Sequence, residues 1–232
     1  MRLIANMVAR NEADRFLPEV LDHLKGIVDE IVFSDDASTD STLQVAKDAG
    51  AHTYESPWGH PMFTENEGKL RQWSWSNLEQ HAQPGDWILA IDADEKLYET
   101  FDGVSVRDLM KDRFDVINIK FVHMWSETHW RNDKLWKPSN SFRLFRFREG
   151  GTYRDRRLAC GAEPSYVIEA VRNRNYLVQS GLVMQHLGYQ RDEDKKMKYD
   201  RYMTLDKGEF HNIKHLVSIM DRDPELVEWT LS

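Results

Sequence analysis

A run of five apolar residues, 87–91, leads directly into two carboxylates, Asp92 and Asp94. Such a run is typical of a strand buried in a sheet. Two acids where a buried strand ends cost free energy unless a positive group meets them. Mg²⁺ and Mn²⁺ take oxygen ligands and often share them with the phosphates of a nucleotide, so the pair indicates a divalent cation site. The alternative is an acidic turn that faces solvent, because Asp-x-Asp is common by chance.

A second polar loop, residues 34–42, follows another strand-like run at residues 30–33. It precedes a helical pattern that stops at Gly50, and Asp, Ser and Thr are good N-caps. One cap needs one acceptor, whereas this loop offers three carboxylates and several hydroxyls. Open α/β sheets bind their ligands at the carboxyl ends of strands, so the surplus predicts a polar ligand at this strand end.

The composition limits the class of protein. The chain has 232 residues, which suits one large domain, and a net charge of −8 without a basic run, which argues against nucleic-acid binding. The single cysteine, Cys160, excludes an internal disulfide and a Cys-based metal site, and it fits a reducing cytosol. No stretch approaches the ~20 apolar residues of a membrane span, and the apolar N-terminus is too short for a signal peptide. We therefore expect a soluble, cytoplasmic protein.

Hydrophobic periodicity predicts alternating strands and helices in the first half of the chain. The expected strands cover residues 3–8, 30–34, 52–55 and 87–91, and the expected helices cover residues 16–24, 40–49 and 67–81. This order favours a mostly parallel sheet with right-handed crossovers. In the second half we expect a helix at 104–112, strands at 115–122, 142–147, 176–178 and 182–185, and a helical tail from about residue 191. Because no Pro/Ser-rich linker interrupts the chain, residues 1–232 are expected to form a single domain.

Four motifs occur in order along residues 1–205. They are Ala9-Arg10-Asn11-Glu12, Asp35-Asp36-Ala37-Ser38-Thr39-Asp40, Asp92-Ala93-Asp94-Glu95, and Gln185-His186-Leu187-Gly188-Tyr189 followed by Lys195, Lys198 and Tyr202. Together they resemble the motifs of family-two glycosyltransferases, where the second reads D-D-G-S-T-D. The resemblance implies an α/β GT-A fold, a nucleoside-diphosphate sugar as donor (a UDP-sugar is favoured), and Mn²⁺ or Mg²⁺ as cofactor. It also implies a nucleotide-sugar-binding half at 1–100, an acceptor-binding half at 101–205 and a helical tail at 206–232.

The resemblance assigns roles to individual residues. Donor contacts are expected from Ala9, Arg10, Asn11, Glu12, Asp36, Arg71, Asp92, Ala93 and Lys195. Asp36 would accept a hydrogen bond from the base, while Asp94 and His186 would ligate the metal. An acidic protein repels a diphosphate, so the metal together with Arg10, Arg71 and Lys195 would reverse the local field.

Inverting transfer, which the family implies, needs a carboxylate that deprotonates the acceptor hydroxyl. Glu163 precedes the His186 motif by about two dozen residues, as the general base does in related proteins, and Asp155 and Glu169 are rivals. The tryptophans of residues 123–136 could stack on a sugar or simply pack. The acceptor could be a glycan, a lipid-linked precursor, a small molecule or a protein.

Two other functions compete with glycosyl transfer. A sugar nucleotidyltransferase usually opens with a Gly-rich loop after its first strand, but residues 9–12 contain no glycine. An inactive nucleotide-sugar-binding protein would not need the intact pair Asp92 and Asp94. Processive polysaccharide synthases are disfavoured because the chain has neither membrane helices nor a Q-x-x-R-W motif.

Overall fold

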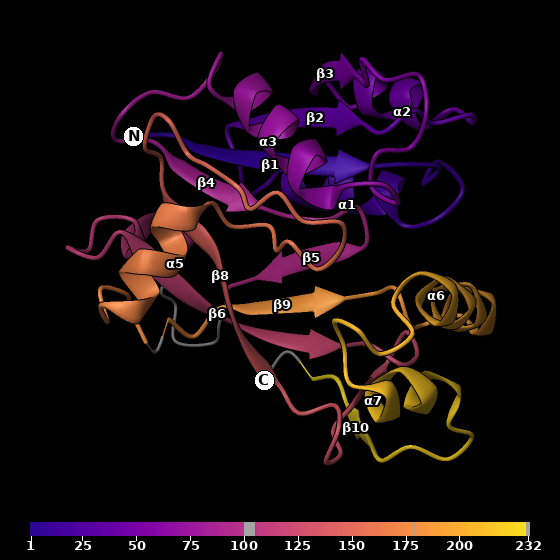
Figure 1. Ribbon diagram of the computed structural model, residues 1–232. Helices are drawn as coiled ribbons and strands as arrows, with labels where there is room; N and C mark the ends of the chain where they lie inside the picture. The colour runs from indigo at the N-terminus through magenta and orange to yellow at the C-terminus, as the bar shows by residue number, and fades with distance from the viewer. Residues whose placement is uncertain (100–104, 179, 231–232) are drawn as a thin grey trace.

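The computed structural model describes residues 1–99, 105–178 and 180–230, and its centre is one eight-stranded sheet. The strand order is β3-β2-β1-β4-β8-β6-β9-β5 (Figure 1). The bounds are Leu3–Ala9 for β1, Glu30–Asp35 for β2, His52–Glu55 for β3, Trp87–Ala90 for β4, Glu95–Tyr98 for β5, Val116–His123 for β6, Ser139–Arg146 for β8 and Val183–His186 for β9. Only β8 and β5 run against the other six strands, so the expected mostly parallel sheet is confirmed.

The first half follows the expected alternation of strands and helices. Its helices are α1 (Leu17–Leu24), α2 (Thr42–Asp48) and α3 (Glu67–Leu78). Helix α1 buries residues at helical spacing, including Val20, Leu21 and Leu24. In α3 the side chain of Asn66 caps the helix by accepting a hydrogen bond from the Lys69 amide at 2.9 Å. Parallel pairing of β1 with both β2 and β4 brings the carboxyl ends of three strands together.

The second half departs from the expectations at several points. Strand β5 was not predicted, and the expected strand at 176–178 is wrong, because Leu177 forms only an isolated bridge with Ile117. The sequence also failed to predict the small sheet of β7 (His129–Arg131) and β10 (Leu226–Glu228) and helix α5 (Ser165–Arg172), whereas α7 (Ile213–Val217) lies within the expected helical tail. The expected helix at 104–112 is the short α4 (Val106–Leu109), and its predicted first residue lies outside the described ranges. So does the predicted boundary at residues 100/101.

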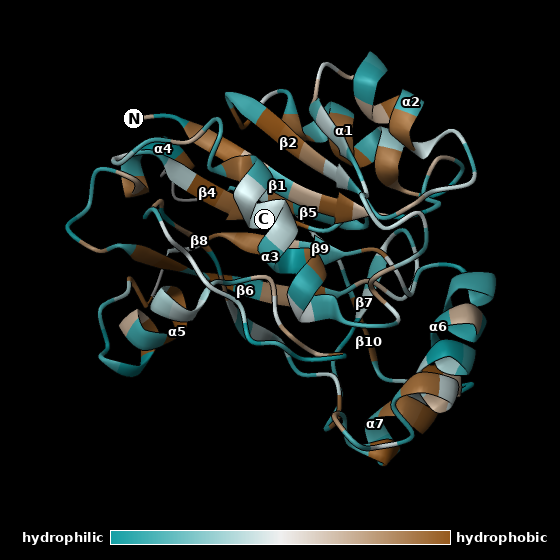
Figure 2. Cartoon of the chain, turned by 45° about the horizontal axis from the view of Figure 1, so that its top comes forward, coloured by the Kyte–Doolittle hydropathy of each residue, from teal (hydrophilic) through white to brown (hydrophobic). Residues whose placement is uncertain are grey.

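The two faces of the sheet carry separate hydrophobic clusters, because side chains alternate along each strand. Leu3, Ala5 and Met7 of β1 join the cluster that packs against α1 and α2. Ile4 points to the opposite face, where α3 and α5 pack. Hydrophobic colour accordingly concentrates on the central strands in Figure 2.

The chain after β9 packs beyond the carboxyl ends of β6 and β9, as Figure 1 shows. It contains α6 (Asp192–Leu205), α7 and a short 3₁₀ turn at Ser218–Met220. A third cluster, formed by Trp125, Trp136, Tyr189 and Ile219, attaches this segment to the sheet. In the described part of the chain, no helix has the length and apolar character needed to cross a bilayer.

Candidate functional site

A cavity of about 640 Å³ opens where β1, β2 and β4 end. Its lining includes ten of the twelve residues to which the sequence assigned a site role. They are Ala9, Arg10, Asn11, Glu12, Asp36, Arg71, Asp92, Ala93, Asp94 and His186. Glu163 and Lys195 do not line it. The cavity therefore lies at the carboxyl ends of the strands, where the sequence predicted a ligand site.

The loops after β1 and β2 are joined by hydrogen bonds through Asn11. Its amide donates to Ser38 Oγ at 3.0 Å, and its side-chain oxygen accepts from the Thr39 amide at 2.8 Å. Asn11 and Ala37 both have left-handed backbone, with φ of 54° and 56°. Asparagine tolerates this region, whereas Ala37 holds it at a cost, where the related motif has glycine.

Asp36 fastens the segment 56–66 to the end of β2. Its carboxylate is buried and accepts the amides of Met62 at 2.7 Å and Phe63 at 3.0 Å. Burial raises the pKa of Asp36, although these two amides oppose the shift. Its predicted hydrogen bond to a nucleotide base stays a prediction.

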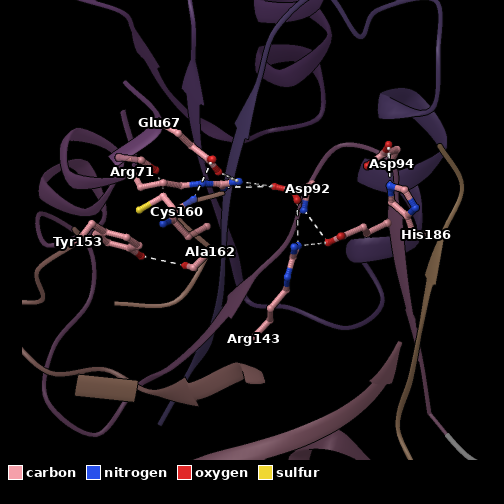
Figure 3. Close-up of polar contacts among 12 residues, drawn as sticks. Glu67, Arg71, Asp92, Asp94, Arg143, Tyr153, Cys160, Ala162 and His186 are labelled. Atoms are coloured by element: carbon pink, nitrogen blue, oxygen red, sulfur yellow. Dashed lines mark hydrogen bonds and ion pairs between the residues drawn. The ribbon is translucent and has the colours of Figure 1, made fainter. Parts of the chain in front are cut away.

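Asp92 lies between two arginines. Both terminal nitrogens of Arg71 lie 3.2 Å from Asp92 Oδ1, and Arg143 Nη1 donates to Oδ2 at 3.0 Å. Figure 3 shows the two guanidinium groups approaching the carboxylate from different directions. Burial alone would raise the pKa of Asp92, but Arg143 and Arg71 lower it to about 2. Asp92 is thus an anion held in place by cations from α3 and β8.

Arg143 also binds Glu95, the first residue of β5. Glu95 is fully buried and accepts the Asp92 amide at 2.9 Å in addition to Arg143. Its burial raises its pKa to about 8 despite the arginine. One guanidinium therefore fixes both carboxylates, and with them the turn that carries Asp94.

Asp94 lies in a second cluster with His186, Lys198 and His123. Asp94 Oδ2 is 3.3 Å from His186 Nε2 and accepts from Lys198 Nζ at 2.9 Å. Lys198 Nζ is also 2.9 Å from His186 Nε2, and His186 Nδ1 is 3.0 Å from His123 Nδ1. Figure 3 shows Asp94 and His186 facing each other.

The protonation states of this cluster follow from its burial and charges. Although burial opposes it, Lys198 and His186 hold the pKa of Asp94 well below its usual value. Burial and the neighbouring Lys198 lower the pKa of His186. The pair is thus a carboxylate beside a neutral imidazole at physiological pH.

Comparison with known proteins decides the family. The family model described as Glycosyl transferase family 2 matches residues 6–162, more than half of the chain. The chain belongs to glycosyltransferase family 2. An uncharacterized glycosyltransferase from Rickettsia felis is 34% identical over 100 residues, and one from Rickettsia bellii is 33% identical over 100. The matched parts cover 41% of this chain but only 30% and 29% of these curated relatives.

Solved structures agree on the fold. S. aureus TarS 1-349, in crystals with UDP-GlcNAc, has a TM-score of 0.55 and 16% sequence identity, covering 95% of this chain and 70% of that one. The same protein with UDP has a TM-score of 0.53 and 18% identity, covering 96% and 71%. At such identity the likeness concerns the fold alone. The GT-A fold implied by the motifs is confirmed.

The residues present fit the divalent cation that this family implies. A carboxylate oxygen and a neutral imidazole nitrogen 3.3 Å apart are suitable metal donors, and the remaining positions suit phosphate and water oxygens. Gly188 keeps the space beside them open, because a Cβ there would lie 2.3 Å from Asp94 Oδ2 and 2.1 Å from Lys198 Nζ.

Two predicted site residues of this family-2 protein lie away from the cavity. Lys195 pairs with Asp192 at 3.0 Å, and its amine lies 5.4 Å from the centre of the Trp125 ring. Glu163 is half-buried, directly after the lining residues Gly161 and Ala162. A Cβ on Gly161 would lie 3.1 Å from Glu163 Oε2, so the carboxylate lies close to a residue that lines the cavity.

The rivals of Glu163 are less well placed. Asp155 is exposed and accepts a hydrogen bond from Asn66, and Glu169 is exposed on α5. Glu12, which the resemblance assigned to donor binding, also has properties that suit a general base. Burial raises the pKa of Glu12 to about 7 although Arg15 opposes it, and its Oε2 has no hydrogen-bond partner among the described residues.

Several charged residues of the cavity had no site role predicted from the sequence, among them Arg143, Lys198 and Arg201. Arg143 lies within the strand expected at 142–147 but had no predicted role, and Lys198 was noted only as part of the tail motif. Arg201 gave no signal; its guanidinium lies 5.4 Å from the Phe63 ring and lines the cavity. Spacing on α6 could have suggested it, because Arg201 lies one turn after Lys198.

The tryptophans of residues 123–136 pack rather than line the cavity. Trp125 and Trp136 are buried with ring centres 4.9 Å apart, and Trp125 stacks on Tyr189 at 5.3 Å. Arg131 lies 4.7 Å from Trp125 and 5.3 Å from Trp136. This cluster supports the turn that carries His186 and Gly188.

Proposed function

We propose that the protein transfers a sugar from a UDP-sugar to an acceptor hydroxyl, with inversion and with the help of Mn²⁺ or Mg²⁺. The observation that carries this proposal is the pair of charge clusters in one cavity. Asp94 and His186 present a metal-type donor pair, and Asp92 is fixed beside it by Arg71 and Arg143. The complexes of TarS with UDP-GlcNAc and UDP support a uridine nucleotide as donor.

The charges of the cavity suit a diphosphate leaving group. Negative charge builds on the leaving phosphate as the glycosidic bond breaks, and a divalent cation held by Asp94 and His186 would stabilise it. Arg10 and Arg201 also line the cavity and add positive charge to an otherwise acidic chain. Arg71 and Arg143 differ from Arg10 and Arg201, because both pair with Asp92 and act by holding it in place.

The acceptor hydroxyl requires a base, for which we propose Glu163. A positioned carboxylate takes the proton of the hydroxyl as the new bond forms. Glu163 follows the cavity wall at Gly161 and Ala162, on the side of the second half of the chain. The candidate acceptors are a glycan, a lipid-linked precursor, a small molecule and a protein.

Calorimetric titration of UDP, GDP, ADP and CDP, with and without Mn²⁺, tests the proposal. We expect UDP to bind, and to bind more tightly with Mn²⁺ present, because a divalent cation held by Asp94 and His186 would attract the negative charge of the diphosphate. Binding of no diphosphate, or of free triphosphates alone, would contradict it and favour a nucleotidyltransferase. Tight UDP binding without turnover on any UDP-sugar would favour the inactive binder.

A further inference from the structure

Lys198 occupies the position that a cation needs between Asp94 and His186. Its Nζ is 2.9 Å from Asp94 Oδ2 and 2.9 Å from His186 Nε2, the two atoms that face each other at 3.3 Å. The Lys198 side chain is 8% exposed, so the contact is enclosed rather than a surface pair. We propose that Lys198 is an internal counter-ion that competes with the divalent cation for Asp94 and His186. This inference rests on the metal-dependent function proposed above.

Lys198 and a metal compete because both need the lone pair of the same His186 nitrogen. His186 Nδ1 faces His123 Nδ1 at 3.0 Å, so Nε2 is the only ring nitrogen left for a metal. The same nitrogen accepts from Lys198, which has donors only. A metal at Nε2 must therefore replace the ammonium, and the two positive charges would also repel each other.

The same contact prepares the histidine for the metal. A nitrogen that accepts from Lys198 carries no proton, so the proton of the neutral ring lies on Nδ1 and points to His123. That is the tautomer in which Nε2 can ligate a metal, and a partner on the other nitrogen fixes it. Lys198 thus keeps the site neutralised and correctly protonated while the metal is absent.

Lys198 can leave without moving its helix. The first turn of α6 is anchored because Arg15 Nε donates to Asp194 at 3.0 Å, and Asp194 is buried. The lysine stem has four rotatable carbons, so the ammonium can turn into the cavity that Lys198 lines. A donor diphosphate offers it anionic oxygens there. Metal and diphosphate should then bind cooperatively, because each favours the displaced lysine.

The experiment measures Mn²⁺ affinity, by electron paramagnetic resonance of the free ion, in the wild type and in Lys198→Met. Without nucleotide we expect Lys198→Met to bind Mn²⁺ about tenfold more tightly, since Asp94 loses its competing cation. UDP should raise the Mn²⁺ affinity of the wild type by a larger factor than that of the variant. Lys196→Met is the control, because Lys196 is exposed on the same helix and pairs with the exposed Asp200.

Lys198→Gln, which keeps a hydrogen-bond donor without the charge, replaces Lys198→Met if the latter does not fold, as judged by circular dichroism. Equal or weaker Mn²⁺ binding in these variants would overturn the inference while leaving the proposed function intact. Absence of Mn²⁺ binding from every variant, with UDP still bound, would overturn both the inference and the metal dependence. Loss of UDP binding as well would contradict the donor assignment itself.

Discussion

The carboxylates of the cavity come from one half of the chain, whereas its cations come from both halves. Every carboxylate in the described lining comes from before residue 100, whereas Arg143, Lys198 and Arg201 come from after it. The first half adds arginines as well, namely Arg10, Arg15 and Arg71. Glu12, Glu67 and Asp92 pair with arginines of the first half, but Glu95 and Asp94 meet Arg143 and Lys198 only when β8 and α6 assemble beside them. The first half therefore places the site, and the second half supplies the cations that face Asp94 and Glu95.

The largest effect is expected from removing Asp94, whose side-chain partners His186 and Lys198 come from the second half. Asp94→Ala deletes the proposed metal ligand and leaves Lys198 and His186 without their anion. We expect kcat/KM to fall by about 10³-fold, or ~4 kcal/mol, in a protein that retains its fold. Steady-state kinetics across a Mn²⁺ series would measure it. Full activity of Asp94→Ala in the presence of a chelator would refute the metal assignment.

The same contrast explains what the sequence could predict of the fold. Strand β3 has the bounds expected from sequence, His52–Glu55, because neighbouring runs and turns define it locally. Strand β5 was missed because Glu95–Tyr98 is amphipathic and short, and its partner β9 lies at Val183–His186. Pairing over such separations depends on the whole sheet rather than on any local pattern. For the same reason, residues 176–178 have the local pattern of a strand but do not form one in the sheet.

The candidate site divides in the same way. Asp36, Asp92 and Asp94 could be identified because each follows a buried strand. Arg143 could not, because its role arises from the antiparallel register that sets Leu144 opposite Leu89 and so brings Arg143 beside the end of β4. A sequence reading sees a basic residue in a strand, whereas the sheet places its guanidinium against two buried acids.

Replacing Arg143 therefore tests most directly whether the acids of the first half depend on a cation from the second half. Arg143→Met leaves Asp92 and Glu95 buried without their shared cation, and we expect a loss of roughly 3 kcal/mol in unfolding free energy. Arg148→Met is the matched control, because Arg148 is half exposed and pairs with Asp115, so it should cost less than about 1 kcal/mol. Urea unfolding would measure both. Similar values for the two variants would show that the acids do not need the second half.

Glu163 tests whether the second half also contributes to the chemistry. Glu163→Gln keeps the shape of the side chain, so we expect unchanged UDP affinity and a fall of about 10²-fold in kcat. Glu12→Gln serves as the comparison from the first half, since Glu12 lines the cavity and burial raises its pKa to about 7. If Glu12→Gln loses turnover at unchanged UDP affinity while Glu163→Gln keeps it, the base belongs to the first half.

A smaller effect is expected from a charge pair formed entirely within the first half. Asp86 is buried and accepts hydrogen bonds from the Arg2 amide at 2.9 Å, from the Arg2 side chain and from the Gln83 amide at 3.2 Å. Burial opposes ionisation, but these bonds lower the pKa of Asp86 below its usual 3.8. Asp86→Asn should therefore cost about 1–2 kcal/mol of stability at pH 7 and leave UDP binding unchanged.

The pH dependence of that cost separates a charge effect from a packing effect. Because the folded pKa of Asp86 is lowered, its stabilisation is complete above the unfolded pKa and disappears as the pH falls through the folded one. The difference between wild type and Asp86→Asn should thus shrink as the pH falls from neutral into the acid range. Asp22→Asn, which changes an acid with an 81% exposed side chain, should show no such trend. If the stability cost of Asp86→Asn stays constant with pH, then Asp86 connects β1 to β4 through its packing rather than through its charge.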